Sequence, residues 1–263
     1  MLSGLSPPRR RSVLALVAVL AVCAVAIVGL GIFRAISTPS VVAQDDVGPV
    51  IVLSGYGGNT DVLEPIVEEL EGLGREVWVF PPVADNRGDL SEQAQALDDF
   101  VLGVLNETDA GAVDLVGYSA GGVVARLWVR DYDGGQVARR VVTIGSPHHG
   151  TGVSSLATEA GGCPPACEQL RPDSDFLRRL NAGDETPAGP QWITLRTEDD
   201  QTVTPSRSAD LEGALTLAVQ QYCPQATTSH GQLPSSAPVL SVLPLVLAEA
   251  HPTPPGRDQV ACG

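Results

Sequence analysis

The sequence contains no lysine, and no acidic residue precedes Asp45. From Asp45 onward, 12 arginines stand against 31 acidic residues, so this part of the chain carries a formal charge of −19. A surface of that sign repels nucleic acids and anionic lipid headgroups, whereas it tolerates neutral substrates such as esters. The composition therefore argues against a nucleic-acid partner.

The cysteines lack the regular paired spacing of a structural zinc site, since Cys-x₃-Cys without a second such pair matches it poorly. Cys23 lies in an apolar N-terminal stretch, and four cysteines follow much later. An even number beyond a targeting segment is typical of an oxidising compartment. Of the three possible pairings, we favour Cys163 with Cys167, through a short loop with two prolines, and Cys223 with Cys262, which would fasten the C-terminal tail. We expect no metal.

Charged residues are also missing from residues 13–33. At ~1.5 Å per residue, a helix of this length spans the ~30 Å apolar core of a bilayer. Three arginines before it and one after it predict a cytoplasmic basic segment at residues 1–12 and an extracytoplasmic remainder. The alternative is a signal sequence cleaved near residues 41–43. Both interpretations place the later residues outside the cytoplasm, and the first adds a membrane anchor.

Beyond a linker at residues 34–46, apolar runs alternate with segments of helical spacing. Buried strands are predicted at residues 50–53, 77–80, 113–116, 140–144 and 192–195, with a last strand-like run at residues 217–220. This alternation predicts an α/β domain over residues 47–250, with a mostly parallel sheet and helices on both faces, preceded by one N-terminal apolar helix. Residues 251–263 are expected to form a tail.

Residues 150–189 are irregular, with a cysteine pair, a proline pair and a glycine-rich end. A segment of this length inside a compact domain is usually functional. It either borders a substrate cleft or forms a disulfide-stapled excursion on the surface.

The strand predicted at residues 113–116 leads directly into Gly117-Tyr118-Ser119-Ala120-Gly121. A strand, a very tight turn and a helix are the context in which a Gly-x-Ser-x-Gly serine acts as a nucleophile. The two glycines let the strand and the helix approach closely while Ser119 takes a strained conformation. The free amides at the helix start suit a developing oxyanion. The alternative is a glycine-rich turn that merely holds a serine.

A serine hydroxyl is a weak nucleophile unless a base takes its proton, and an acid must orient that base. In one large class of serine hydrolases the histidine comes last in the chain, after the acid. His230 meets this order, because it follows the last strand-like run. We interpret His148 and His149 as groups of the site wall bonded to backbone, whereas His251 lies in the proline-rich tail.

The acid is expected in the loop that follows residues 192–195. Glu198, Asp199 and Asp200 are adjacent there, and local spacing cannot choose between them. The tetrahedral intermediate also needs two backbone amides. Ala120 supplies one, and the glycine-rich loop after the first strand supplies the other, at Tyr56 between two glycines. That loop could also be an ordinary strand-to-helix turn.

Four motifs together resemble the small bacterial extracellular lipases and esterases of the α/β-hydrolase superfamily, over about residues 47–247. They are Ser-Gly-Tyr-Gly-Gly at 54–58, Gly-Tyr-Ser-Ala-Gly-Gly at 117–122, Gly-Ser-Pro-His-His-Gly-Thr at 145–151, and Asp-Gln-Thr-Val-Thr-Pro at 200–205 with Ser-His-Gly at 229–231. In that family the acid stands five residues before a proline, which implies Asp200. The residue after the first glycine of the oxyanion loop supplies its amide, which implies Tyr56. One departure is Ser54, where these lipases usually have histidine.

The resemblance implies an α/β-hydrolase fold and the hydrolysis of carboxylic esters, with acylglycerol-like lipids as substrates and an acyl-enzyme intermediate. It implies no metal and no organic cofactor. Two alternatives remain open: an extracytoplasmic acyltransferase that uses the same three side chains on envelope lipids or glycans, and a binding module without activity. The sequence leaves the oligomeric state open.

Overall fold

The structure, a computed structural model, describes residues 42–263. The basic segment and the apolar helix predicted at residues 1–33, and most of the predicted linker, lie outside these residues. Within residues 42–263, no helix has both the length and the apolar character needed to cross a membrane.

Six strands form one parallel sheet in the order β2-β1-β3-β4-β5-β6. The strands are β1 (Val50–Leu53), β2 (Val77–Val79), β3 (Val113–Tyr118), β4 (Ala138–Ile144), β5 (Gln191–Arg196) and β6 (Leu215–Ala218). From β1 the chain runs outward to β2, and it then returns to place β3 on the other side of β1. Winding therefore reverses between β1 and β3, and such a reversal opens a crevice at the carboxyl ends of the strands.

The last strand begins and ends earlier than the sequence indicated. β6 covers Leu215–Ala218, and the next residues form the helical turn α8 (Val219–Tyr222). Pairing with β5 stops at Arg196 opposite Ala218, where β5 itself ends. The apolar character of Val219 is used to pack α8 into the core, so the expectation of a strand at residues 217–220 was partly wrong.

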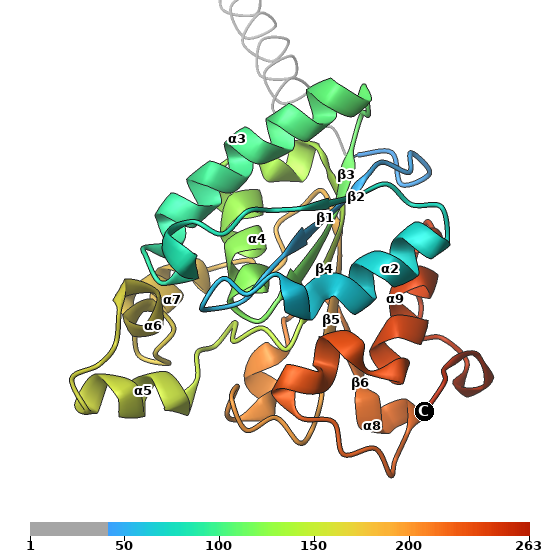
Figure 1. Ribbon diagram of the computed structural model, residues 1–263. Helices are drawn as coiled ribbons and strands as arrows, with labels where there is room; N and C mark the ends of the chain where they lie inside the picture. Colours follow the sequence, from blue (N-terminus) through green and yellow to red (C-terminus); the bar gives the residue numbers. More distant parts are fainter. Residues whose placement is uncertain (1–41) are drawn as a thin grey trace, which may run out of the picture. The chain divides into compact units, whose positions relative to one another are not determined.

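Helices cover both faces of the sheet (Figure 1). On one face lie α3 (Leu90–Thr108) and α4 (Ala120–Asp131), and on the other lie α2 (Glu64–Gly72) and α9 (Ala237–Ala248). Short 3₁₀ turns connect these elements at Asp61–Leu63, Ala84–Asn86, Gly134–Gln136, Ser206–Ala209, His230–Ser235 and Arg257–Gln259. Each face has its own hydrophobic core.

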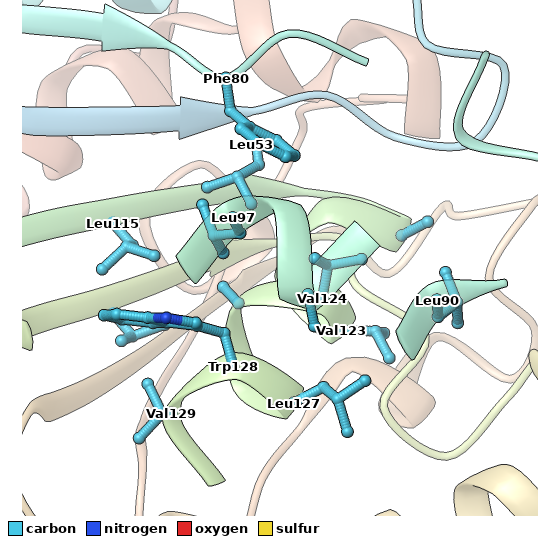
Figure 2. Close-up of a cluster of buried hydrophobic side chains, with 14 of the residues drawn as sticks. Leu53, Phe80, Leu90, Leu97, Leu115, Val123, Val124, Leu127, Trp128 and Val129 are labelled. Carbon is cyan, nitrogen blue, oxygen red and sulfur yellow. The ribbon is translucent and has the colours of Figure 1, made fainter. Parts of the chain in front are cut away.

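Trp128 is the largest fully buried side chain in the core beneath α3 and α4. It is 1 % exposed and lies near Leu97 of α3 and Leu115 of β3 (Figure 2). Its indole nitrogen donates a hydrogen bond to the Asp98 carboxylate at 2.9 Å. Burying an aliphatic or aromatic side chain of this kind contributes about 1.5–3 kcal/mol. The core therefore fixes α4, whose first turn carries the serine bend, against the sheet.

The irregular segment at residues 150–189 contains three short helices, which lie together in Figure 1. They are α5 (Gly152–Glu159), α6 (Pro165–Gln169) and α7 (Asp175–Leu180). Both predicted disulfides are present. Cys163–Cys167 closes the turn between α5 and α6, and Cys223–Cys262 fastens the C-terminal tail beside α8.

Candidate active site

Ser119 stands at a sharp bend between β3 and α4. Its backbone has φ 53° and ψ −126°, a region that non-glycine residues rarely occupy and that costs about 1–3 kcal/mol. The amide of Ser119 still donates to the Ile144 carbonyl oxygen at 2.8 Å, so β4 holds the bend in place. Gly121 allows the bend, because a Cβ there would lie 2.6 Å from the Ser54 carbonyl oxygen. The strained turn expected from the sequence is present.

His230 reaches Ser119 from the 3₁₀ turn that follows β6 and α8. Its Nε2 lies 3.1 Å from Ser119 Oγ, and its Nδ1 lies 2.8 Å from Asp200 Oδ2. Because Nδ1 faces a carboxylate, it carries the proton, and Nε2 is left to accept from the serine hydroxyl. All three residues are at most 9 % exposed. The structure thus brings together three residues that lie up to 111 positions apart in the sequence.

Asp200 is held by backbone amides as well as by the imidazole. Its Oδ1 accepts hydrogen bonds from the amides of Thr202 at 2.8 Å and Val203 at 2.7 Å. The adjacent Asp199 is exposed and accepts instead from Gln220 at 3.0 Å. Of the three acidic residues that spacing left open, Asp200 is the one that contacts His230.

Tyr118 fixes the histidine from its other side, a role that the sequence did not indicate. The Tyr118 hydroxyl donates to the His230 carbonyl oxygen at 3.2 Å, and the two rings lie 5.2 Å apart at a tilt of 31°. Burial raises the pKa of Tyr118 to about 12, and the negative charge of Asp200 also raises it. The hydroxyl therefore stays protonated and keeps donating at any physiological pH.

The loop after β1 lies directly against Ser119. A Cβ on Gly55 would lie 2.8 Å from Ser119 Cβ, so only glycine permits this approach. Among the described residues, neither the Tyr56 amide nor the Ala120 amide donates to another protein group. Two free amides beside a hydroxyl are the donors that an oxyanion requires.

Asn86 anchors that loop at Ser54, the position that departs from the histidine of the lipases this sequence resembles. Its side-chain nitrogen donates to Ser54 Oγ at 3.0 Å, to the Gly55 carbonyl oxygen at 3.1 Å and to the Ser54 carbonyl oxygen at 3.3 Å. Its oxygen accepts from the Val83 amide at 3.1 Å. Asn86 is 4 % exposed and its φ is 51°, in the left-handed region. No local sequence pattern marks this contact, because the partners lie about 30 residues apart.

The other histidines do not contact Ser119. His148 is completely buried, and its Nε2 pairs with Thr143 Oγ1 at 3.0 Å, whereas His149 bonds the Ser208 carbonyl oxygen and Glu185. The side chain of His149 therefore makes the expected contact with the backbone. The side chain of His148 instead pairs with the hydroxyl of Thr143. Burial holds the pKa of His148 well below its usual value, and the charge of Arg126 adds to this. His251 is exposed in the tail.

A cavity of about 200 Å³ opens beside Ser119. Its walls come mainly from the loop after β1, from the loop with Asp200 and from α5 and α6. The residues that line it are Tyr56, Pro147, Thr151, Val153, Ser154, Ala157, Gly162, Cys167, Leu170, Thr202 and Val203. Residues 150–189 therefore border the site, as one of the two interpretations of this segment predicted. In residues 42–263, no three His, Cys, Asp or Glu side chains cluster as a metal site would require.

The parallel sheet, the serine bend and the residues around it define an α/β hydrolase. A family model described as Lipase (class 2) matches residues 84–239, more than half of the sequence. The chain belongs to the class 2 lipase family. Its two disulfides are typical of an extracellular protein.

Solved structures of lipases share the fold. Lipase B of Aspergillus fumigatus superposes with a TM-score of 0.71 at 18% identity, over 82% of this chain and 56% of the fungal chain. The chain thus spans little more than half the length of that enzyme. The mature lipase BlEst2 of Bacillus licheniformis gives a TM-score of 0.60 at 17% identity, over 72% of this chain and 87% of the other.

Proposed function

We propose that this protein is an extracytoplasmic serine hydrolase that cleaves acylglycerol-like esters through an acyl-enzyme. The observation that carries the proposal is the alignment of Ser119 Oγ, the His230 imidazole and the Asp200 carboxylate at 3.1 and 2.8 Å. A hydroxyl in contact with such an oriented base loses its proton as it attacks.

In the proposed reaction, Ser119 Oγ attacks the ester carbonyl carbon and His230 Nε2 takes the hydroxyl proton. Asp200 keeps the imidazolium oriented, and the amides of Tyr56 and Ala120 donate to the oxyanion. When the tetrahedral intermediate collapses, the ester C–O bond breaks and His230 gives its proton to the leaving alcohol. Water then attacks the acyl-enzyme by the same route, releasing the carboxylic acid and the free Ser119 hydroxyl.

The surroundings of the cavity support a lipid substrate. Tyr56, Val153 and Leu156 are apolar or aromatic side chains that are 42, 43 and 68 % exposed. The first two also line the cavity. An exposed apolar surface beside an apolar cavity favours a neutral substrate with a hydrocarbon chain, and the acidic surface disfavours an anionic headgroup.

An active-site-directed fluorophosphonate tests the assignment. We expect the probe to label the wild-type protein and not Ser119→Ala, which should also lose ester hydrolysis by about 10⁴-fold or more. Ser91→Ala, which removes an exposed serine of α3, is the matched control and should react normally. Labelling or hydrolysis that survives in Ser119→Ala would refute the proposal.

The acyltransferase alternative differs only in the acceptor of the acyl group. Product analysis with an added alcohol separates the two. Predominant formation of the new ester at low alcohol concentration would favour transfer, whereas release of the free acid alone supports hydrolysis.

A further inference from the structure

The disulfide Cys163–Cys167 is part of the wall of the cavity beside Ser119. Cys167 lines the cavity and is 7 % exposed, and Gly162, which directly precedes Cys163, lines it as well. The bond joins the turn after α5 to α6, with the two Cα atoms 5.3 Å apart. The second disulfide, Cys223–Cys262, contributes no residue to this cavity.

Helix α5 supplies another part of the same wall but has little core of its own. Val153, Ser154 and Ala157 line the cavity, yet only Ser154 is buried among the residues of α5. The start of α5 is held by hydrogen bonds from the Gly152 amide to the Thr204 carbonyl oxygen and from the Thr151 hydroxyl to the Thr202 carbonyl oxygen.

The end of α5 has no comparable support. The amides of Gly161 and Gly162 bond only to carbonyl oxygens of the same helix, Thr158 and Ala157. Cys163 is the next residue, so the disulfide adds a cross-link between the turn that ends α5 and Cys167 of α6. By contrast, α6 buries Ala166 and Cys167 and is tied to the Arg87 carbonyl oxygen through the Ala166 amide.

We propose that the Cys163–Cys167 disulfide sets the acyl-chain preference by fixing α5 as the wall of the acyl-binding cavity. The inference rests on the proposed ester hydrolysis at Ser119. The cavity of about 200 Å³ opens beside Ser119, and α5 limits how much of an acyl chain it can enclose. Enclosing more of a longer acyl chain requires α5 to move outward, and the disulfide opposes that movement.

The test compares two variants that each lack one disulfide, Cys163→Ser/Cys167→Ser and Cys223→Ser/Cys262→Ser. The measurement is kcat/KM for p-nitrophenyl butyrate, octanoate, laurate and palmitate. We expect wild-type protein to prefer butyrate or octanoate. In the first variant, the laurate-to-butyrate ratio should rise about tenfold, whereas the second should keep the wild-type ratio.

Thermal unfolding separates a change in selectivity from general destabilisation. The variant expected to lose more melting temperature is not the one expected to change its chain-length preference. The disulfides span 4 and 39 positions of sequence, and the longer loop restricts the unfolded chain more. The control variant should therefore lose more melting temperature while its chain-length profile stays unchanged. An unchanged profile in Cys163→Ser/Cys167→Ser, or the same shift in both variants, would overturn the proposal.

Two further measurements keep the test decisive if the first variant does not fold. Reducing folded Cys223→Ser/Cys262→Ser with dithiothreitol opens only Cys163–Cys167, and should shift its profile towards laurate. Ala157→Leu fills the cavity from α5 with the disulfide intact, and should lower the octanoate-to-butyrate ratio about tenfold. No change in either measurement refutes the inference. Adding Ser119→Ala to each protein must abolish hydrolysis, and hydrolysis that persists refutes the proposed function instead.

Discussion

Strand β3 carries a buried polar cluster at each of its ends, and the two clusters are built differently. Near its start, Asp114 accepts from Arg75 at 2.7 Å and from two nitrogens of Arg139 at 2.9 and 2.5 Å. Just beyond its end, Ser119 meets His230 and Asp200. Asp114 and Arg139 have no exposed surface, whereas Ser119 lines a cavity.

At the first cluster the polar groups of Asp114 and Arg139 are bonded to protein. Arg139 also donates to the carbonyl oxygens of Leu247 and Gln44, so it links β4 to the end of α9 and to the residues before β1. At the second cluster, the amides of Tyr56 and Ala120 lack protein acceptors in the described part of the chain. A closed cluster stabilises one packing, while an open one leaves donors free for a substrate. Substitutions should therefore affect stability at one end and activity at the other.

Among substitutions that leave Ser119 in place, the largest effect is expected for Asp200→Asn. The amide oxygen should stay with the Thr202 and Val203 amides, so the NH₂ group faces His230 Nδ1 and donates to it. The imidazole is then held in the wrong tautomer, and kcat should fall by about 10³–10⁴-fold. The melting temperature should change little. Asp199→Asn, at the exposed neighbouring position, is the control and should retain kcat within about twofold. Steady-state kinetics with p-nitrophenyl butyrate measure kcat for both variants. Equal losses of kcat would show that Asp200 is not the acid that orients His230.

Asp114→Asn should show the reverse pattern. It leaves the buried guanidinium of Arg139 without a counter-charge, which costs about 3–5 kcal/mol of unfolding free energy. The kcat of the protein that remains folded should stay at the wild-type value. Denaturant unfolding measures the loss, with Asp173→Asn, in an exposed pair with Arg171, as a control that should lose less than about 1 kcal/mol. A variant of Asp114 that is stable but inactive would contradict the division between the two ends.

The substitution Asn86→Ala tests whether the loop with Ser54 and Gly55 needs the Asn86 side chain to keep its position beside Ser119. Without the amide, Ser54 and Gly55 lose three hydrogen bonds, and the Tyr56 amide loses its fixed position. Losing one oxyanion donor outright costs about 10²–10³-fold, so a loosened donor should lower kcat by about 10–100-fold with little change in KM. Asn59→Ala is the control, because Asn59 is exposed in the same loop and bonds only the Asp61 amide. A folded Asn86→Ala with normal kcat would show that the loop keeps its geometry unaided.

The sequence predicted the parts of the fold that local patterns encode. Apolar runs located the strands within two residues at β1 to β5, and the Gly-x-Ser-x-Gly pattern located the bend at Ser119. Asp200 was separated from its two acidic neighbours only through a family resemblance, because all three share the same local context. In the structure, the backbone amides of Thr202 and Val203 donate to the Asp200 carboxylate and hold it beside His230.

Contacts between distant segments could not be predicted in this way. Asn86 sits in a polar turn with no recognisable motif, and its role depends on packing against a loop about 30 residues earlier. Tyr118 occupies a variable position of the serine motif, so its bond to the His230 carbonyl oxygen has no sequence signal. The ion pairs of Asp114 likewise have no signal in its apolar strand, since Arg75 and Arg139 reach the carboxylate only in the folded chain. Each of these contacts can be recognised only in the folded structure.

The smallest expected effect concerns His148, which is buried near the open cluster but lacks contact with Ser119. Because its pKa is lowered in the folded state, the unfolded chain binds a proton more readily than the folded one. Stability is therefore complete above the unfolded pKa of about 6.5 and falls as the pH drops below it, by up to about 1.4 kcal/mol per pH unit. His148→Gln should remove this part of the acid sensitivity, seen as a smaller loss of unfolding free energy between neutral pH and about pH 5.5. His251→Gln, in the exposed tail, should keep the wild-type slope. If kcat fell in His148→Gln while the slope stayed unchanged, His148 would belong with the residues that act on substrate.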